Sequence, residues 1–361
     1  MGGQRREVAW CAWAVPAAVL AACILAAPGP TDARKDRSPA QDAKRNRLRA
    51  ELKALPHRIV YESLRGTQWD LLMVHADGSN PVNLTKTADV NELYPHASPD
   101  GSKICFLADE GTGRSKVRSV YYMDAPAPSG AAAPAGAARK LVARNARHPC
   151  WGPAGRRIAY TPDEYPRFSY RSYATKGITV YDLAAGTRRE HPNPAVKHLY
   201  ALKWSPDGRW FLATVHGALG HDHADLAIEA EGTGVYRLKI INGCRPDVRA
   251  DGKKVVWNAT DHAIAVADLD LTTSPPTVSN PRQVVTCDKD HEVYHADFSP
   301  DGRYIAFAHG PRGSQAVGMR APGWHICVAD VRETNVCVVL TRDGASNKEP
   351  DWVPVGKGPR K

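Results

Sequence analysis

Histidine and carboxylate side chains occur close together in two stretches of this 361-residue sequence. The first stretch is His221-Asp222-His223, and the second contains His291 and His295. Imidazole and carboxylate groups together are typical ligands of zinc, manganese or iron. We therefore take His221, His223, His291 and His295 as candidate ligands of a divalent transition metal. The alternative, that these histidines bind no metal, stays open because an H-x-H pair is not specific.

A turn motif that recurs six times predicts the elements that position these residues. In most copies, proline at the second position of the turn and glycine at its end favour a tight turn. Alternating apolar residues follow the turn. The copies begin 54, 53, 44, 50 and 54 residues apart, a period typical of four-stranded propeller blades. They are Ala97–Gly101, Trp151–Gly155, Trp204–Gly208, Val248–Gly252, Phe298–Gly302 and the shortened Trp352–Pro354.

The two ends of the repeat region predict how the ring closes. Residues 58–61 match the second strand of a blade, and residues 350–353 match a first strand with no partner after it. We therefore expect the C-terminal strand to complete the N-terminal blade, which leaves no open sheet edge. The predicted fold is an all-β, six-bladed β-propeller over residues 58–356.

The motif also carries a family resemblance. Trp204-Ser205-Pro206-Asp207-Gly208-Arg209 and its relatives resemble the PD40 (WD40-like) repeats of TolB-like propellers. The resemblance covers residues 58–356 and implies a fold more than a function. These repeats are also similar to those of propeller polysaccharide lyases such as oligogalacturonate lyase, which hold a metal on loop histidines. That second resemblance implies an alternative function, a metal-dependent carbohydrate-active enzyme.

Blade topology sorts the loops onto two faces. The turn face holds the recurring turns, and the loop face holds the segments that enter each inner strand or join the second strand to the third. Ten of the 14 histidines are expected on the loop face. They are His96, His148, His198, His216, His221, His223, His262, His291, His295 and His309.

One position in each repeat is expected to line the mouth of the central channel. It lies three residues before the first motif residue and is occupied by Tyr94, His148, Ala201, Arg245, His295 and Glu349. We take the five polar or aromatic members as candidate binding residues. Arg245 would pair with a carboxylate or phosphate, and Tyr94 would stack on a sugar. The alternative is a solvated ring without a ligand.

The N-terminus predicts export. Arg5 and Arg6 precede an uncharged run over residues 8–27, and Leu20-Ala21-Ala22-Cys23 resembles a bacterial lipobox with Cys23 as the lipidated residue. A cleaved secretory signal and an uncleaved membrane anchor are the alternatives. We expect a leader over residues 1–33, a charged linker over 34–57, and a protein of the periplasm or cell envelope.

Charge and cysteine complete the expectations. Residues 1–58 hold 11 basic and 5 acidic residues, so they account for +6 of the net charge of +10. Because most of the positive charge lies outside the predicted propeller, nucleic-acid binding is not expected.

Residues 125–138 are rich in alanine and proline and predict a disordered insertion. Cys327 and Cys337 are a candidate disulfide of an exported protein.

The expected function is non-enzymatic. The sequence favours an exported, monomeric binding or scaffold protein that holds an envelope protein or a glycan on its loop face and needs no cofactor. The alternative is a metal-dependent lyase that uses manganese, zinc or iron on the same face.

Overall fold

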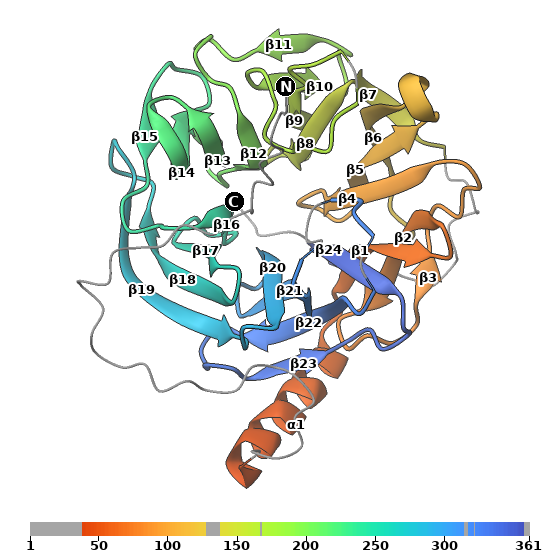
Figure 1. Ribbon diagram of the computed structural model, residues 1–361. Helices are drawn as coiled ribbons and strands as arrows, with labels where there is room; N and C mark the ends of the chain where they lie inside the picture. The colour runs from red at the N-terminus through yellow and green to blue at the C-terminus, as the bar shows by residue number, and fades with distance from the viewer. Residues whose placement is uncertain (1–37, 128–137, 167, 314–316, 321, 357–361) are drawn as a thin grey trace, which may run out of the picture.

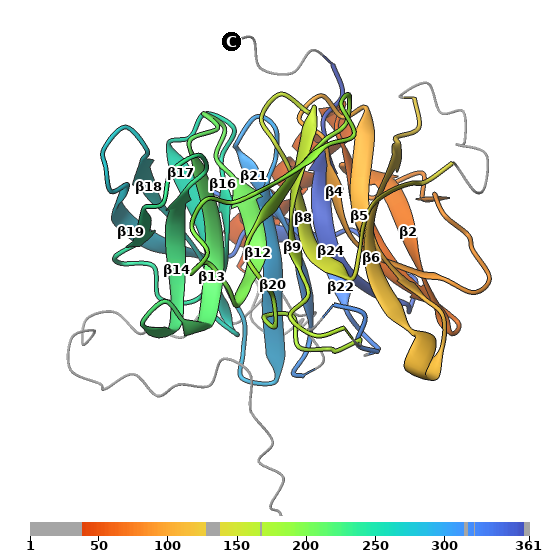
Figure 2. The ribbon, with the colours of Figure 1, turned by 90° about the horizontal axis from the view of Figure 1, so that it is seen from above.

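The computed structural model describes residues 38–127, 138–166, 168–313, 317–320 and 322–356. Six four-stranded antiparallel sheets surround a central channel, as Figure 1 shows. This arrangement confirms the predicted all-β, six-bladed propeller. Figure 2 shows the strands running between the two faces of the ring.

The four strands of each blade follow one another from the channel outward. From the innermost to the outermost strand, blades one to three are β24 (Ser346–Val353), β1 (Arg58–Arg65), β2 (Gln68–His75), β3 (Val82–Asn83); β4 (Asn91–Ala97), β5 (Lys103–Glu110), β6 (Val117–Asp124), β7 (Lys140–Arg144); and β8 (Ala146–Trp151), β9 (Arg157–Pro162), β10 (Thr179–Asp182), β11 (Arg188–Glu190). Blades four to six are β12 (Leu199–Trp204), β13 (Trp210–Ala218), β14 (His221–Glu229), β15 (Val235–Arg237); β16 (Cys244–Val248), β17 (Lys254–Thr260), β18 (Ala263–Asp270), β19 (Thr277–Thr286); and β20 (His291–Phe298), β21 (Tyr304–Pro311), β22 (His325–Asp330), β23 (Cys337–Val339).

The C-terminal strand closes the ring as predicted. β24 pairs with β1 in antiparallel register, with Arg58 opposite Val353 and Leu64 opposite Ser346. The first blade therefore contains strands from both ends of the propeller sequence. This pairing covers the edge that each strand would otherwise expose.

The recurring turn is stabilised by its own side chains. In the fourth blade, Ser205 Oγ accepts a hydrogen bond from the backbone N–H of Trp210 at 2.9 Å and donates one to Asp207 Oδ1 at 2.6 Å. Gly208 has a φ of 77°, in the left-handed region that favours glycine. In blades two to six, each such turn joins an innermost strand to the second strand at the turn face.

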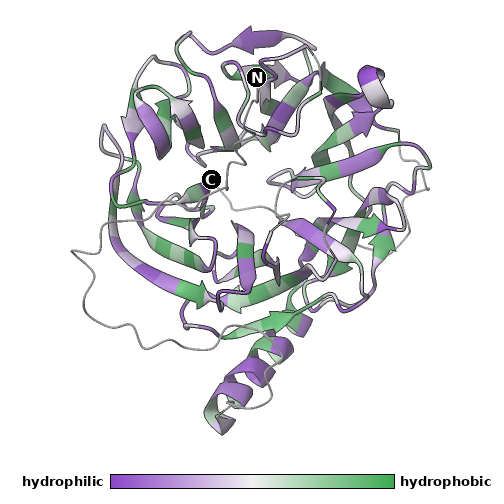
Figure 3. Cartoon of the chain, viewed as in Figure 1, coloured by the Kyte–Doolittle hydropathy of each residue, from purple (hydrophilic) through white to green (hydrophobic). Residues whose placement is uncertain are grey.

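A helix precedes the propeller and packs on it. The helix α1 (Pro39–Ala54) begins at the N-cap Ser38. Leu48 and Leu52, each 1% exposed, pack in a hydrophobic cluster with residues of blades one and six. Figure 3 shows α1 as largely hydrophilic beside the hydrophobic β23. The charged linker expected over residues 34–57 is thus a docked helix over most of its length.

Several sequence predictions lie outside the described residues. The leader over residues 1–33, with Cys23, and positions 128–137 of the expected insertion are among them. Within the part of the chain that the structure describes, no helix is both long and apolar enough to span a membrane. The leader and its lipidation stay predictions.

Candidate functional site

Each innermost strand contains a β-bulge at the position predicted to line the channel. The strand registers shift there in all six blades. The six bulge residues have φ values between 47° and 60°, the left-handed region that non-glycine residues rarely adopt. They are Tyr94, His148, Ala201, Arg245, His295 and Glu349, and we call them the bulge ring.

Side chains of the bulge ring contact one another inside the channel. His295 Nδ1 lies 2.6 Å from Glu349 Oε2 and 2.8 Å from Arg245 Nη1. The rings of Tyr94 and His148 meet edge to face, with centroids 5.6 Å apart. Burial raises the pKa of Glu349 to about 7. The structure thus places the predicted binding residues in contact within the channel, deeper than the predicted mouth.

Loops cover the loop-face end of the bulge ring. Val317 is buried in the cluster that contains Tyr94. The Met319 carbonyl accepts a hydrogen bond from Lys348 Nζ at 2.9 Å, and the Ser172 carbonyl lies 2.8 Å from His148 Nε2. These contacts bring loop segments against the bulge ring on the face where the sequence predicted a ligand.

The channel opens instead at the turn face. A funnel of about 820 Å³ lies there, lined by the recurring turns of all six blades. Its walls are largely apolar and aromatic, and its rim carries proline and alanine. The wall and rim residues include Trp151, Trp204, Phe298, Trp352, Pro99, Pro153, Pro206, Ala250, Pro300 and Pro354.

A second ring forms the floor of the funnel, two residues after each bulge position. Its members, the floor ring, are His96, Cys150, Lys203, Asp247, Asp297 and Asp351, and all six line the funnel. The floor ring was not predicted from the sequence, and the expected position of His96 at the loop face was wrong. Counting two residues past each bulge position in the repeats could have found this ring.

An ammonium group neutralises part of the floor ring. Lys203 Nζ donates a hydrogen bond to Asp297 Oδ1 at 2.5 Å and lies 3.4 Å from Asp247 Oδ1. Burial opposes protonation of Lys203, but Asp297, Asp247 and Asp351 together raise its pKa well above the usual value. The floor therefore holds one lysine among three carboxyl groups.

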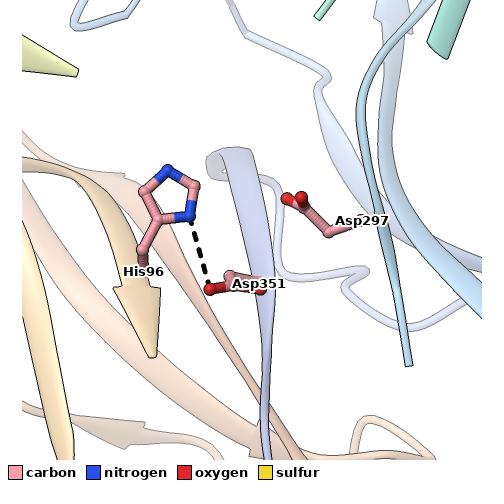
Figure 4. Close-up of side chains that lie close together, drawn as sticks. All are labelled: His96, Asp297 and Asp351. Atoms are coloured by element: carbon pink, nitrogen blue, oxygen red, sulfur yellow. Dashed lines mark ion pairs between the residues drawn. The ribbon is translucent and has the colours of Figure 1, made fainter. Parts of the chain in front are cut away.

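Three floor residues could hold a metal ion. Figure 4 shows His96, Asp297 and Asp351 turned toward one another from three strands. One ligand atom of each lies within 4.8 Å of the others. Burial and the charge of Lys203 lower the pKa of His96, which favours the neutral imidazole that a metal requires. Among the described residues, His96 Nε2 has no hydrogen-bond partner.

The metal ligands predicted from sequence lie in two different blades. His221 and His223 are on β14 in blade four, whereas His291 and His295 are on β20 in blade six. His223 Nε2 lies 2.8 Å from the Tyr200 hydroxyl. Among the described residues, the group suited to a metal is His96, Asp297 and Asp351, which we call the floor set. It contains none of these four residues.

The structure does not join Cys327 and Cys337 by a disulfide. The two residues are on the neighbouring strands β22 and β23, but Cys327 pairs with Val339 and Ala329 pairs with Cys337. The two cysteines are therefore offset diagonally by two residues. A disulfide requires Cα atoms within about 7 Å of each other, which directly opposed residues on paired strands satisfy more readily than diagonal ones.

Comparison with known proteins bears on the fold. No protein-family model and no curated protein sequence matches the chain. TolB from Acinetobacter baumannii matches in structure with a TM-score of 0.59 and 20% identity, over 83% of this chain and 67% of that one. The chain has a TolB-like β-propeller fold.

Other propellers of different function match this TolB-like fold about as well. Kuenenia stuttgartiensis hydrazine synthase matches with a TM-score of 0.57 and 11% identity, over 88% of this chain and 50% of that one. A chain of the nidogen/laminin complex matches with a TM-score of 0.53 and 9% identity, over 82% of this chain and 98% of that one. Likeness at these identities shows the architecture alone.

Proposed function

We propose that this TolB-like propeller is an exported cell-envelope protein that binds a segment of a partner protein in its turn-face funnel. The funnel itself is the observation that supports this proposal. Its volume of about 820 Å³ is within the range of about 300–1,000 Å³ that ligand pockets occupy. It is concave and mostly apolar, with polar groups gathered at the floor.

The chemistry of the funnel favours a particular kind of segment. Indole and phenyl groups of the wall would pack against apolar side chains. At the floor, Asp247, Asp297 and Asp351 outnumber Lys203, so a lysine or arginine side chain of the partner would gain ion pairs there. We therefore propose an apolar segment that carries one basic residue. A glycan is the other partner class, and it would bind without that requirement.

In this proposal the bulge ring has a supporting role. Tyr94, His148, Arg245, His295 and Glu349 lie beneath the funnel floor and contact one another. They would hold the innermost strands at the spacing that the floor ring requires. The loop face would then carry no partner.

A displayed library of random peptides of about twelve residues tests the funnel. The tag-free full-length protein should select peptides with one lysine or arginine among apolar residues. Their binding should weaken at least about tenfold in Asp297→Asn and Asp351→Asn, because a charge-assisted hydrogen bond is lost. Ala250→Trp should block entry at the rim.

The matched control changes the loop face. Asp222→Asn is an exposed carboxylate substitution there and should leave peptide affinity unchanged. Equal binding by wild type and Ala250→Trp would overturn the funnel proposal. Selection of glycans in place of peptides on an array would assign the funnel to the other partner class.

Export and anchoring are part of the proposal and have a separate test. Residues 1–37 fused to alkaline phosphatase should give active enzyme outside the cytoplasm. Cys23→Ser should release the fusion from the membrane fraction if Cys23 carries the lipid, because acyl chains supply the anchor. A fusion that stays inactive would contradict export.

The floor set favours one second candidate, a metal-dependent enzyme. His96, Asp297 and Asp351 would hold the ion, and a bound metal would act as a Lewis acid on a sugar carboxylate. Elemental mass spectrometry of the tag-free protein tests this. About one equivalent of manganese, zinc or iron that is lost in Asp297→Asn, with turnover of uronate polymers, would support the enzyme. Metal-free protein without turnover would contradict it.

A further inference from the structure

The chain leaves its last described strand at the mouth of the funnel. In blades two to six, the turn after the innermost strand continues into the second strand, but β24 of blade one is the last described strand. The three residues Pro354, Val355 and Gly356 follow it and line the funnel. The next segment, residues 357–361, lies outside the described residues and therefore starts at the funnel mouth.

Contacts at the rim fix the point where this segment begins. The Val355 backbone N–H donates a hydrogen bond to His57 Nδ1 at 3.2 Å. The turn of blade two packs so closely on the Pro354 carbonyl oxygen that a Cβ on Gly101 would collide with it. Gly356 has a φ of 105°, which favours glycine and permits the chain to change direction there. The segment can thus turn toward the channel from a fixed starting point.

The segment and the funnel have opposite charge. The segment holds three basic residues and no acidic one, in the order Lys357-Gly358-Pro359-Arg360-Lys361. Among the described residues that line the funnel, four are aspartates and one, Lys203, is basic. The four aspartates are Asp207, Asp247, Asp301 and Asp351. Although Asp207 is paired with Arg209 at 2.8 Å and Lys203 with Asp297, the lining still carries more carboxylates than cations. A basic segment would gain ion pairs there.

The segment is long enough to reach the floor. Asp351 lies five residues before Gly356, so at most about 18 Å of chain separates the two. Arg360 lies four residues after Gly356, and the backbone between them spans about 13–14 Å when extended. The long arginine side chain extends further. The Arg360 guanidinium can therefore return to the depth of the Asp351 carboxylate.

We propose that residues 357–361 fold back into the funnel of the same molecule, where Arg360 and Lys361 pair with the carboxylates of Asp351 and Asp247. This inference rests on the proposed function, because it makes the segment a competitor of the partner's basic residue. A segment joined to its site by a few residues has an effective concentration in the millimolar range. Contacts of about millimolar affinity are then sufficient to occupy the funnel, and the partner has to displace them.

Carboxypeptidase B tests the contact directly. This enzyme removes C-terminal lysine and arginine, so intact-mass spectrometry of the tag-free full-length protein follows the loss of Lys361 and Arg360. Loss should be at least about threefold slower in wild type than in Asp247→Asn/Asp351→Asn, because a segment seated in the funnel is protected. Sodium chloride at about 1 M should abolish the difference, since it screens ion pairs. The exposed loop-face variant Asp222→Asn is the matched control and should behave as wild type.

A second variant keeps the test decisive if the double variant does not fold. Ala250→Trp fills the rim without changing a carboxylate and should also speed the loss of Lys361. Equal rates in wild type and Ala250→Trp would overturn the inference. Protection that disappears on about tenfold dilution of the protein would assign the segment to the funnel of a second copy, and would overturn the contact within one molecule.

Peptide binding separates this inference from the proposed function. A chain that ends at Gly356 should bind the selected peptides more tightly than wild type, by the same factor as the protection, because both measure the fraction of molecules with an empty funnel. Equal peptide affinity in the two chains, without protection, would contradict this inference and leave the funnel proposal standing. Protection in a protein that selects no peptide would contradict the proposed function alone.

Discussion

Lys203 Nζ lies 2.5 Å from Asp297 Oδ1, across the floor of the funnel. The two residues come from blades four and six, so the ammonium group reaches past the intervening blade. It also lies 3.4 Å from His96 Nδ1, a candidate metal ligand. The Lys203 ammonium group therefore occupies the position between the candidate ligands where a divalent cation would bind. It competes with such an ion for the carboxylates.

This competition gives the first prediction. Lys203→Met should raise the affinity of the floor for calcium or manganese by at least about tenfold, because it removes a positive charge within about 4 Å of the ligands. Isothermal titration calorimetry at constant ionic strength measures the change. Lys254→Met removes a lysine that pairs with Asp268 at 2.5 Å on the blade surface, and serves as the control. Equal affinity in both variants would contradict the competition.

The repeats predicted the blades because turn chemistry is local. Proline and glycine set the backbone angles of most of the turns. Counting back from the turn gave the channel-lining position of every blade, which the structure shows to be a bulge. The same counting forward reaches Asp247, Asp297 and Asp351, a carboxylate in three of six copies, so the floor ring was visible in the sequence.

The open end of the channel was not predictable in this way. It depends on Ser172 and on residues 317–320, which lie in loops that share no pattern between blades. Likewise, the docking of α1 depends on Leu48 and Leu52, two apolar residues in a segment whose charge indicated a linker. Tertiary contacts of single side chains decided both features, and local patterns carry little information on such contacts.

The bulge ring makes a prediction about backbone strain. Ala201 has a φ of 52°, which costs an alanine about 1 kcal/mol or more but costs glycine little. Ala201→Gly should therefore raise the free energy of unfolding by about 1 kcal/mol. Urea denaturation measures it. Ala227→Gly, in the regular strand β14, should instead lower stability by about 0.5–1 kcal/mol. Destabilisation by both changes would contradict the strain.

A buried carboxyl in blade two predicts the pH dependence of stability. Burial raises the pKa of Glu92 to about 7, against opposing hydrogen bonds from Thr87 and Thr85. The folded protein then holds a proton between pH 4.5 and 7 that the unfolded chain releases. The stabilisation is complete below pH 4.5 and is lost as the pH rises through 7.

The variant Glu92→Gln tests whether this carboxyl makes the stability fall as the pH rises. The free energy of unfolding of the wild type, relative to this variant, should fall by about 3 kcal/mol between pH 4.5 and pH 7 and then level off. Urea denaturation at intervals of half a pH unit gives the difference curve. A flat difference, or one that rises with pH, would show that the Glu92 carboxyl is ionised throughout.

The docked helix gives the last prediction, on the seam where the ring closes. Leu52 is 1% exposed against residues of blades one and six, and Glu51 and Arg303 form an ion pair beside it at 2.5 Å. Leu52→Ala should cost about 2–5 kcal/mol, the range for a buried leucine that leaves a cavity. The exposed Lys53→Ala should change stability by less than about 0.5 kcal/mol. Urea denaturation measures both variants. If the helix packed too weakly to stabilise the propeller, both variants would have the urea midpoint of the wild type. If the helix stabilises the closure strand, only Leu52→Ala should unfold at a lower urea concentration.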